Sequence, residues 1–501
     1  MTRIVRALLL SLLAALALAV AGCGGSEAGG GGAVGTQGLA GAELLPADTV
    51  VYAAIDSDLD SDQWQQVDEL LQKFPGRERL ISEIREGLSS EGVSYDDDIE
   101  PALGEALYFA LLDIPGQGAS EEDAPFVFLH KPKDADRFEA LLRKADEDDE
   151  VKFRTIDDGW YVVAENEAAI DDALVAEGGE TLADDERFTA AMDELADDAV
   201  MKLYVNGAPV SAAIRDYGKD AGVDLSSFGY DRFDSLSLAM SAETDGMRLA
   251  GNVRGDLSGE ARGEPFTSKF LPEIPSGALA VLSARGEQQV AEGLRQLRKN
   301  ELMQGAVEQF ERQLGVSIED LAPLFENEIA FYVRPGSPIP ELTLVLESDD
   351  EAGDLRTVDR LVAGVSKLAD GGPVRQSEVD GVTVKSATFG AFALHYAGFD
   401  GRIVVTSGRN AIRDLRSDED KLSDDPTYND AAEAADLPDE TAGLLYLNFE
   451  DGIPLLLDFA QAADTDVPTE VSENLRPLRS FLAFGGAEGE SIDFTAFLAI
   501  E

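Results

Sequence analysis

The sequence predicts an α+β fold: two tandem copies of one unit, each with a largely antiparallel sheet and helices packed on one face. Three observations support it. Matching motifs recur in the same order in the second half of the chain, each half ends in alternating strands, and amphipathic helices separate apolar strands. Glycines and a proline interrupt the pattern near residues 255–268, so we place the first α+β repeat at 43–255 and the second at 265–501.

The internal match is clearest at an offset of 242 residues, without gaps. The ordered set of motifs is too long to have arisen by chance, which indicates a duplication. The matched motifs, first copy before second, are Asp158-Gly159 with Asp400-Gly401, Val162-Val163 with Val404-Val405, Ala169-Ile170 with Ala411-Ile412, and Leu203-Tyr204-x-Asn206 with Leu445-Tyr446-x-Asn448.

The first unit begins with an apolar run rich in β-branched residues, Val50 to Ile55, which predicts a buried strand. Apolar residues at helical spacing from Trp64 to Phe74 predict an amphipathic helix, which Pro75-Gly76 ends. Ser61 or Asp62 is the expected N-cap. Phe126 to Leu129 predicts a further strand, and an amphipathic helix follows from Asp134.

Each unit closes with a hairpin. In the first, apolar residues alternate from Leu236 to Met240, Asp245-Gly246 forms the turn, and Met247 to Val253 alternate back. In the second, the same period runs from Ile492 to Ile500. Hairpins of this kind favour antiparallel sheets with helices on one face.

The amino terminus is typical of an exported lipoprotein. Arg3 and Arg6 precede an apolar stretch, Ala7 to Val20, that is too short to span a bilayer comfortably. Val20-Ala21-Gly22-Cys23 resembles a bacterial lipobox, in which the cysteine is lipidated and the chain is cut before it. The resemblance implies a signal peptide at residues 1–22 and lipidation at Cys23.

A lipidated Cys23 would anchor the protein to the outer face of the cell membrane. Residues 23–42 then form a lipidated cysteine and a glycine-rich tether, which lifts the body off the membrane without fixing its orientation. Cys23 is the only cysteine, so no thiol would remain for disulfides, metal ligation or nucleophilic catalysis.

The formal net charge of −58 limits the classes of partner. A field of this sign repels nucleic acid and anionic headgroups, so we expect no nucleic-acid partner. The acidic residues are scattered, and we interpret them mainly as a solvated surface. Binding of divalent cations is the alternative.

The sequence offers few groups for catalysis. There are two histidines. His130 follows the apolar run that ends at Leu129 and precedes Lys131-Pro132, and His395 is out of phase with its apolar neighbours, so we expect both at the surface or in loops. The usual nucleophile and metal motifs are missing, so we predict no catalytic, cofactor-binding or metal residues. A hydrolase that uses two carboxylates stays possible, but with 98 acidic residues no pair can be nominated.

Asp56 to Asp62 is the most tempting metal site. Asp56, Asp58 and Asp60 take the first, third and fifth places of a calcium loop. However, Ser61 stands where glycine is needed for the turn, and Val67 stands where a bidentate Glu should lie. Helix capping is therefore the preferred interpretation. We also expect the duplicated Asn206 and Asn448 to have a structural role at strand ends.

One family resemblance adds to these inferences. Leu45-Pro46-Ala47-Asp48 before a strand, Gln63-Trp64 opening a helix, and Phe74-Pro75-Gly76 closing it, together with the lipobox and tether, are similar to the bacterial domain-of-unknown-function 3352 family. The resemblance implies an exported or membrane-anchored protein without an assigned activity, and it supplies no site residues.

The sequence therefore favours a non-enzymatic, lipid-anchored envelope protein that binds a hydrophobic ligand or an envelope partner. The alternatives are a surface scaffold or adhesion protein and a carboxylate-dependent hydrolase. An apolar binding surface would favour the first, and a cleft with paired, desolvated carboxylates would favour the last.

Overall fold

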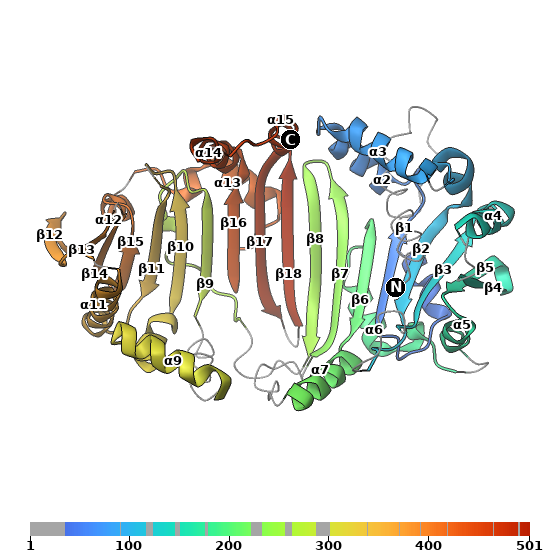
Figure 1. Ribbon diagram of the computed structural model, residues 1–501, viewed down its shortest axis with the longest axis horizontal. Coiled ribbons are helices and arrows are strands. Elements are labelled where there is room, and N and C mark those ends of the chain that lie inside the picture. Colours follow the sequence, from blue (N-terminus) through green and yellow to red (C-terminus); the bar gives the residue numbers. More distant parts are fainter. Residues whose placement is uncertain are drawn as a thin grey trace.

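The computed structural model confirms the α+β class, with one sheet of 18 strands in which all neighbours are antiparallel (Figure 1). It describes residues 36–501 except 91, 117–123, 146–150, 176–178, 222–232, 256–262, 287–300, 338, 370, 391, 418, 464 and 489–490. Within these described residues no helix has the length and apolar character needed to cross a membrane.

The first half contributes eight strands, which pair in the order β4-β5-β3-β2-β1-β6-β7-β8. Their bounds are β1 (Val51–Asp56), β2 (Gly104–Leu111), β3 (Phe126–Pro132), β4 (Lys152–Ile156), β5 (Trp160–Ala164), β6 (Met201–Asn206), β7 (Phe233–Glu243) and β8 (Gly246–Gly255).

The second half repeats this order as β14-β15-β11-β10-β9-β16-β17-β18 and adds β13 and β12 beyond β14. Their bounds are β9 (Ala280–Arg285), β10 (Glu328–Arg334), β11 (Glu341–Glu347), β12 (Arg375–Val379), β13 (Val382–Phe389), β14 (Phe392–Phe399), β15 (Arg402–Thr406), β16 (Gly443–Asn448), β17 (Leu478–Glu488) and β18 (Ser491–Ile500).

The α-helices are α2 (Asp62–Gln72), α3 (Arg77–Ser90), α4 (Ala135–Ala145), α5 (Glu167–Ala173), α6 (Glu186–Asp193), α7 (Gly207–Ala221), α9 (Glu301–Leu314), α10 (Ile318–Leu321), α11 (Glu351–Leu368), α12 (Ala411–Arg416), α13 (Pro426–Ala434), α14 (Phe449–Ala462) and α15 (Thr469–Leu475). The short helices are η1 (Thr36–Glu43), η2 (Tyr95–Ile99), η3 (Glu100–Ala102), η5 (Asp157–Gly159), η6 (Leu182–Asp184), η9 (Leu271–Glu273), η10 (Ala322–Phe325) and η11 (Leu422–Asp424).

Registers in the two halves follow the offset found in the sequence. Tyr204 on β6 lies opposite Tyr52 on β1, and Tyr446 on β16 lies opposite Val281 on β9. The matched Asp-Gly pairs form tight turns before β5 and β15: Asp158 and Asp400 have positive φ angles of 63° and 51°. Positive φ suits Asp and Gly in hairpin turns. The repeat boundaries stay a prediction, since residues 256–262 lie outside the described ones.

The halves meet where β8 pairs with β18, so a single sheet runs through both. Tyr204 and Tyr446 are counterparts in the two halves. Following the strand pairing from each of them toward the junction makes Ala250 the counterpart of Thr495. Ala250 and Thr495 also lie directly opposite each other. A pseudo-two-fold axis, perpendicular to the sheet, therefore passes through this pair.

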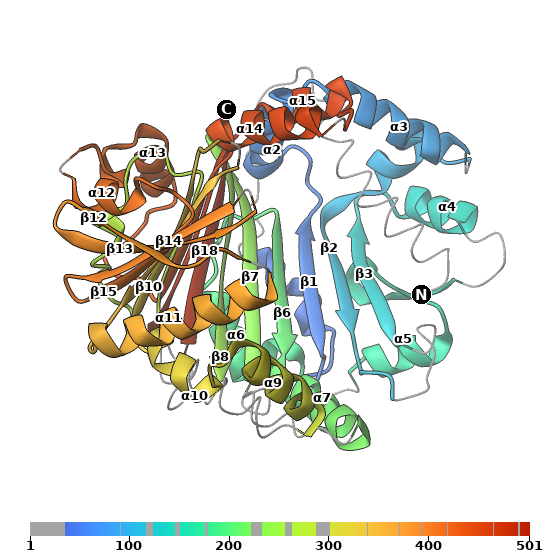
Figure 2. The same ribbon diagram turned by 60° about the vertical axis from the view of Figure 1, so that its left-hand side comes forward.

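The sheet has two different faces. We call the side that carries Tyr52, Tyr204 and Tyr446 the covered face, because η1, α6 and α13 pack on it. The opposite side is the open face. Helices cover its two ends, where Trp64 and Phe138 form one core with β1–β3 and β5, and Val358 and Val362 of α11 form another with β11, β14 and β15. Helix α2 also packs at the margin of the middle strands, where Leu70 forms a small cluster with Ala242 and Ile500. Figure 2 shows α9 and α11 next to each other.

Candidate functional site

The middle of the open face is an apolar surface that is not fully buried. Seven neighbouring strands contribute to it, from β6 to β9 in the sheet order, and Leu282 is 43% exposed. Strand alternation places the following partly exposed side chains there: Leu203, Val205, Leu236, Leu238, Met240, Met247, Leu249, Val253, Ile492, Phe494, Ala496, Leu498, Phe481, Ala483, Leu445 and Leu447.

Strand β7 shows how unusual this surface is. Its small polar residues Ser235, Ser237 and Ser241 are buried on the covered face, where the Ser237 hydroxyl donates to the Ala191 carbonyl of α6 at 3.0 Å. Its large apolar residues Leu236 and Leu238 are partly exposed on the open face. A sheet with one wet side normally shows the reverse pattern. The apolar side chains on the open face are therefore poorly explained by folding alone.

The described helices border this surface, and α2 packs on its upper margin, where Met247 and Leu498 contact the cluster of Leu70, Ala242 and Ile500. In Figure 1, strands β16, β17, β18, β8 and β7 stand side by side, with α14, α15, α2 and α3 beyond their upper ends and α7 and α9 beyond their lower ends. Helix α14 has an apolar stretch around Leu456, which is 68% exposed, and α7 exposes 63% of Tyr217. Because α14 follows β16 as α7 follows β6, these two helices are counterparts.

The upper border joins the two halves. The Gly76 N–H donates to Asn474 Oδ1 at 2.7 Å, and Lys73 Nζ donates to the Ile500 carbonyl at 2.7 Å. Arg79 of α3 forms an ion pair with Glu470 of α15. A Cβ on Gly76 would come within 2.6 Å of the Asn474 amide, so a larger residue would displace that side chain. These contacts fix one edge of the apolar surface.

The duplicated asparagines have the structural role that the sequence indicates. Asn448 Oδ1 accepts from the Asp451 N–H at 3.0 Å and caps α14, and Asn206 Oδ1 accepts from the Ala208 N–H at 3.2 Å at the start of α7. Both helices that border the open face therefore begin at matched positions.

The aspartates of residues 56–62 form a capping cluster around Asp56, which is 1% exposed. Its Oδ1 accepts from the Asp58 N–H at 2.9 Å and its Oδ2 accepts from the Ser61 hydroxyl at 2.6 Å. Ser61 Oγ in turn accepts from the Trp64 N–H and caps α2. Burial raises the pKa of Asp56 to about 7. Both carboxylate oxygens are thus used inside the protein.

The expectation that His130 lies at the surface or in a loop is wrong, because β3 continues to Pro132 and His130 is 1% exposed. Its Nδ1 lies 3.1 Å from the Ala106 carbonyl and its Nε2 lies 2.9 Å from the Ala102 carbonyl. Burial lowers the pKa of His130. The proline does not end the strand early, since Pro132 is the last paired residue.

His395 lies on β14, facing away from Leu394 and Tyr396 as its phase indicates, but it is half-buried and not in a loop. Its Nδ1 lies 2.8 Å from the Ser386 hydroxyl. Burial lowers the pKa of His395 as well. The two histidines belong to different halves of the sheet, so the fold does not bring them together.

Two hydrophilic hollows lie elsewhere. One, of about 740 Å³, is lined by acidic and basic side chains of α10 and α11, where Arg360 pairs with Asp320 at 3.2 Å and Lys385 pairs with Asp359 at 2.6 Å. The other, of about 240 Å³, contains the pair of Arg334 and Asp414 at 2.8 Å. Among the described residues, no group of three His, Cys, Asp or Glu could hold a metal ion.

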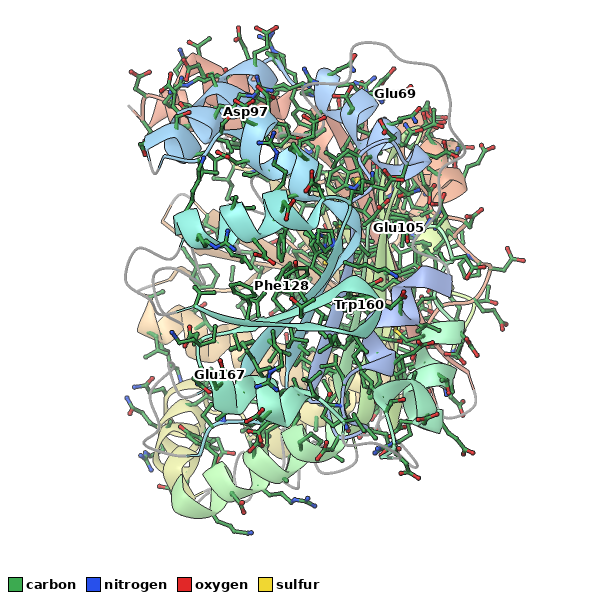
Figure 3. The ribbon with its side chains drawn as sticks, turned by 90° about the vertical axis from the view of Figure 1, so that its right-hand side faces the viewer. Glu69, Asp97, Glu105, Phe128, Trp160 and Glu167 are labelled. Atoms are coloured by element: carbon green, nitrogen blue, oxygen red, sulfur yellow. The ribbon has the colours of Figure 1, made fainter. Side chains whose placement is uncertain are left out.

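The outer surface is acidic, as Figure 3 shows at the end of the sheet formed by the first half. Glu69, Asp97 and Glu167 project outward there, whereas Phe128 lies farther in and packs against Phe138 with ring centroids 6.4 Å apart. Cys23, the predicted lipidation site, lies outside the described residues.

Sequence and structure comparisons give few matches. Solved structures of TP0453 are similar to part of the chain: crystal form IV has a TM-score of 0.24 at 11% identity, covering 46% of this chain and 79% of that one. Crystal form III has a TM-score of 0.22 at 12% identity, covering 46% and 94%. No curated protein matches the chain. The model of the family described as "Protein of unknown function (DUF3352)" matches residues 8–499.

Proposed function

The chain belongs to the DUF3352 family, and from that premise we propose that it is an exported, lipid-anchored envelope protein that binds a hydrophobic ligand on the open face of its sheet. The single observation that carries this proposal is the run of partly exposed apolar side chains across seven neighbouring strands. Soluble proteins rarely expose a large contiguous apolar patch unless it binds a ligand, a protein or a membrane.

The size of the surface suits a long apolar ligand. Seven strands spaced about 4.8 Å apart make it about 29 Å wide, and the seven residues from Ile492 to Leu498 at about 3.3 Å each make it about 23 Å long. Each methylene group removed from water contributes about 0.8 kcal/mol, so a long acyl chain could bind without any charged contact. We therefore favour an acyl-chain ligand.

The predicted anchor agrees with a binding role. Helix η1, the first described element, packs on the covered face, where Ala42 and Leu45 are buried with Tyr52. The tether would therefore be attached on the covered face, away from the apolar surface. Residues 36–42, which the sequence assigns to the tether, are folded in η1, so a flexible tether would comprise only the twelve residues between Cys23 and Thr36. A tether of that length would reach about 20 Å on average and would let the open face turn without resting on the anchoring membrane.

The hydrolase alternative has less support. The carboxylates of the larger hollow are engaged: Asp320 with Arg360, Asp359 with Lys385, and Asp354 with the Ser348 hydroxyl. A scaffold or adhesion role would use the same apolar surface for a protein. The experiment below separates it from ligand binding.

Native mass spectrometry of protein purified from membranes in mild detergent tests the proposal. The full chain should carry co-purified mass that matches lipid or fatty acid. The double variant Leu238→Asn and Phe494→Asn should lose that mass, and the control Ile339→Asn, in the exposed loop between β10 and β11, should keep it. Absence of any such mass from the wild-type chain, or equal loss in the control, would contradict the proposal.

A further inference from the structure

The apolar surface on the open face consists of two equivalent halves. Because Ala250 and Thr495 are counterparts that also lie opposite each other, the pseudo-two-fold axis passes through the middle of the surface. The axis is perpendicular to the sheet and leaves each face on its own side. Strand pairing gives the equivalent positions Leu203 and Leu445, Val205 and Leu447, Leu236 and Phe481, and Leu249 and Phe494.

The two halves keep their apolar character although they differ in sequence. Leu203 and Leu445 are identical, and Leu236 is replaced by a larger apolar residue, Phe481. The bordering helices obey the same symmetry, since α7 and α14 lie at opposite ends of the strands. A ligand that fits one half therefore meets the same kind of surface in the other, turned by about 180°.

We propose that the open face binds two lipid molecules with uncharged or zwitterionic headgroups, one on each half and running in opposite directions. This inference rests on the proposed function. A single lipid molecule whose chains run parallel lacks a two-fold axis perpendicular to the sheet, so it cannot make equivalent contacts with both halves. Two molecules related by that axis can do so, with one headgroup near α14 and the other near α7.

Charge selects the class of lipid. The chain carries a formal net charge of −58, which repels anionic headgroups. The same repulsion opposes a second copy of the chain, which would otherwise be a natural partner for an apolar face. Uncharged or zwitterionic lipids gain the contact with the apolar side chains without this repulsion.

The test is the stoichiometry of bound lipid, measured on the full chain. Protein stripped of lipid is incubated with phosphatidylcholine vesicles, recovered, and weighed by native mass spectrometry. We expect two phosphatidylcholine molecules per chain. Leu203→Gln and Leu445→Gln, which change identical residues at equivalent positions, should each reduce the number to one, and the double variant should reduce it to zero.

Three controls make the outcome clear. A melting curve for each variant shows that it is folded, and Leu236→Gln with Phe481→Gln provides a second matched pair. Phosphatidylglycerol vesicles should load at least tenfold less lipid, and equal loading would refute the charge argument. One lipid per chain, lost in both single variants, would overturn the two-site inference while leaving the proposed function standing. No lipid at all on the wild-type chain would remove the proposed function itself.

Discussion

Ala250 of β8 lies directly opposite Thr495 of β18, and each residue is the counterpart of the other in the two halves of the chain. The junction is thus self-complementary: Met247 faces Leu498, and their counterparts Ile492 and Val253 face each other. Interfaces of two-fold symmetric dimers have this property. In a duplicated chain with such a junction, the edge strand β8 of the first half pairs with the edge strand β18 of the second. Neither of these two edges is then free to aggregate.

The junction strand β8 contains a glycine whose counterpart is larger. A Cβ on Gly251 would lie 2.2 Å from the Ser237 carbonyl oxygen of β7, whereas its counterpart Ala496 carries a Cβ already. We expect Gly251→Ala to lower the free energy of unfolding by about 1–3 kcal/mol through overpacking. Urea denaturation measures this change.

Ala496→Gly is the matched control for that substitution. It adds no clash and should cost only the conformational entropy of glycine, about 0.5–1 kcal/mol. If Gly251→Ala is as stable as the wild type, strands β7 and β8 are not packed as closely at Gly251 as the structure has them.

Asp56 should make stability depend on pH. Burial raises its pKa from the usual 3.8 to about 7, so the folded state binds a proton that the unfolded state releases between these values. The free energy of unfolding contributed by Asp56 therefore falls as the pH rises from about 4 to about 7, by up to about 4 kcal/mol. Asp56→Asn should remove this loss: its Oδ1 can still accept from the Asp58 N–H, and its Nδ2 can donate to the Ser61 hydroxyl oxygen where Asp56 accepts from it.

Melting temperatures of wild type and Asp56→Asn at pH 5 and pH 8 check this expectation. The variant should gain stability at pH 8 and little at pH 5. His130 acts in the opposite sense: its lowered pKa makes the folded state lose stability as the pH falls below about 6.5. A variant that is less stable than the wild type at pH 8 would mean that the charged Asp56 carboxylate supports the cap at α2.

The sequence predicts much of the sheet. Alternation from Leu236 to Met240 and from Ile492 to Ile500 locates the closing hairpins, and the 242-residue offset anticipates the registers of Tyr204 and Tyr446. These features are local or repeated, so one chain suffices to find them. The capping role of Ser61 was predictable for the same reason.

The candidate site was not predictable, because alternation gives a period without saying which side of a strand is covered. Leu238 and Ser237 alternate as in any half-buried strand, and only the position of α6 shows that Ser237 is the buried one. His130 was misplaced because Lys131-Pro132 looks like a strand end. Long-range pairing of β2 with β3 extends the strand past it.

The lipid anchor remains a prediction that fractionation can test. Cys23→Ser should move the protein from the membrane fraction to the soluble fraction, because serine cannot carry the predicted lipid on the Cys23 thiol. Stable anchoring needs two acyl chains, which that lipid would supply. The two-site variants Leu203→Gln and Leu445→Gln are the control and should stay with the membrane. Membrane association that persists in Cys23→Ser would assign the anchor to another part of the protein.

Salt should stabilise the folded chain. A formal net charge of −58 makes like charges such as Glu69, Asp97 and Glu167 repel one another across the surface, which destabilises the compact state. The Debye length falls from about 10 Å at 0.1 M salt to about 3 Å at 1 M, so most of this repulsion is screened over that range. We expect the melting temperature to rise steadily with NaCl.

Calcium should raise the melting temperature no more than magnesium does at equal concentration, because the two Asp56 oxygens already accept hydrogen bonds. A calcium-specific rise of many degrees at millimolar concentration would instead place a cation at residues 56–62, and Asp58→Asn would then be the first variant to measure.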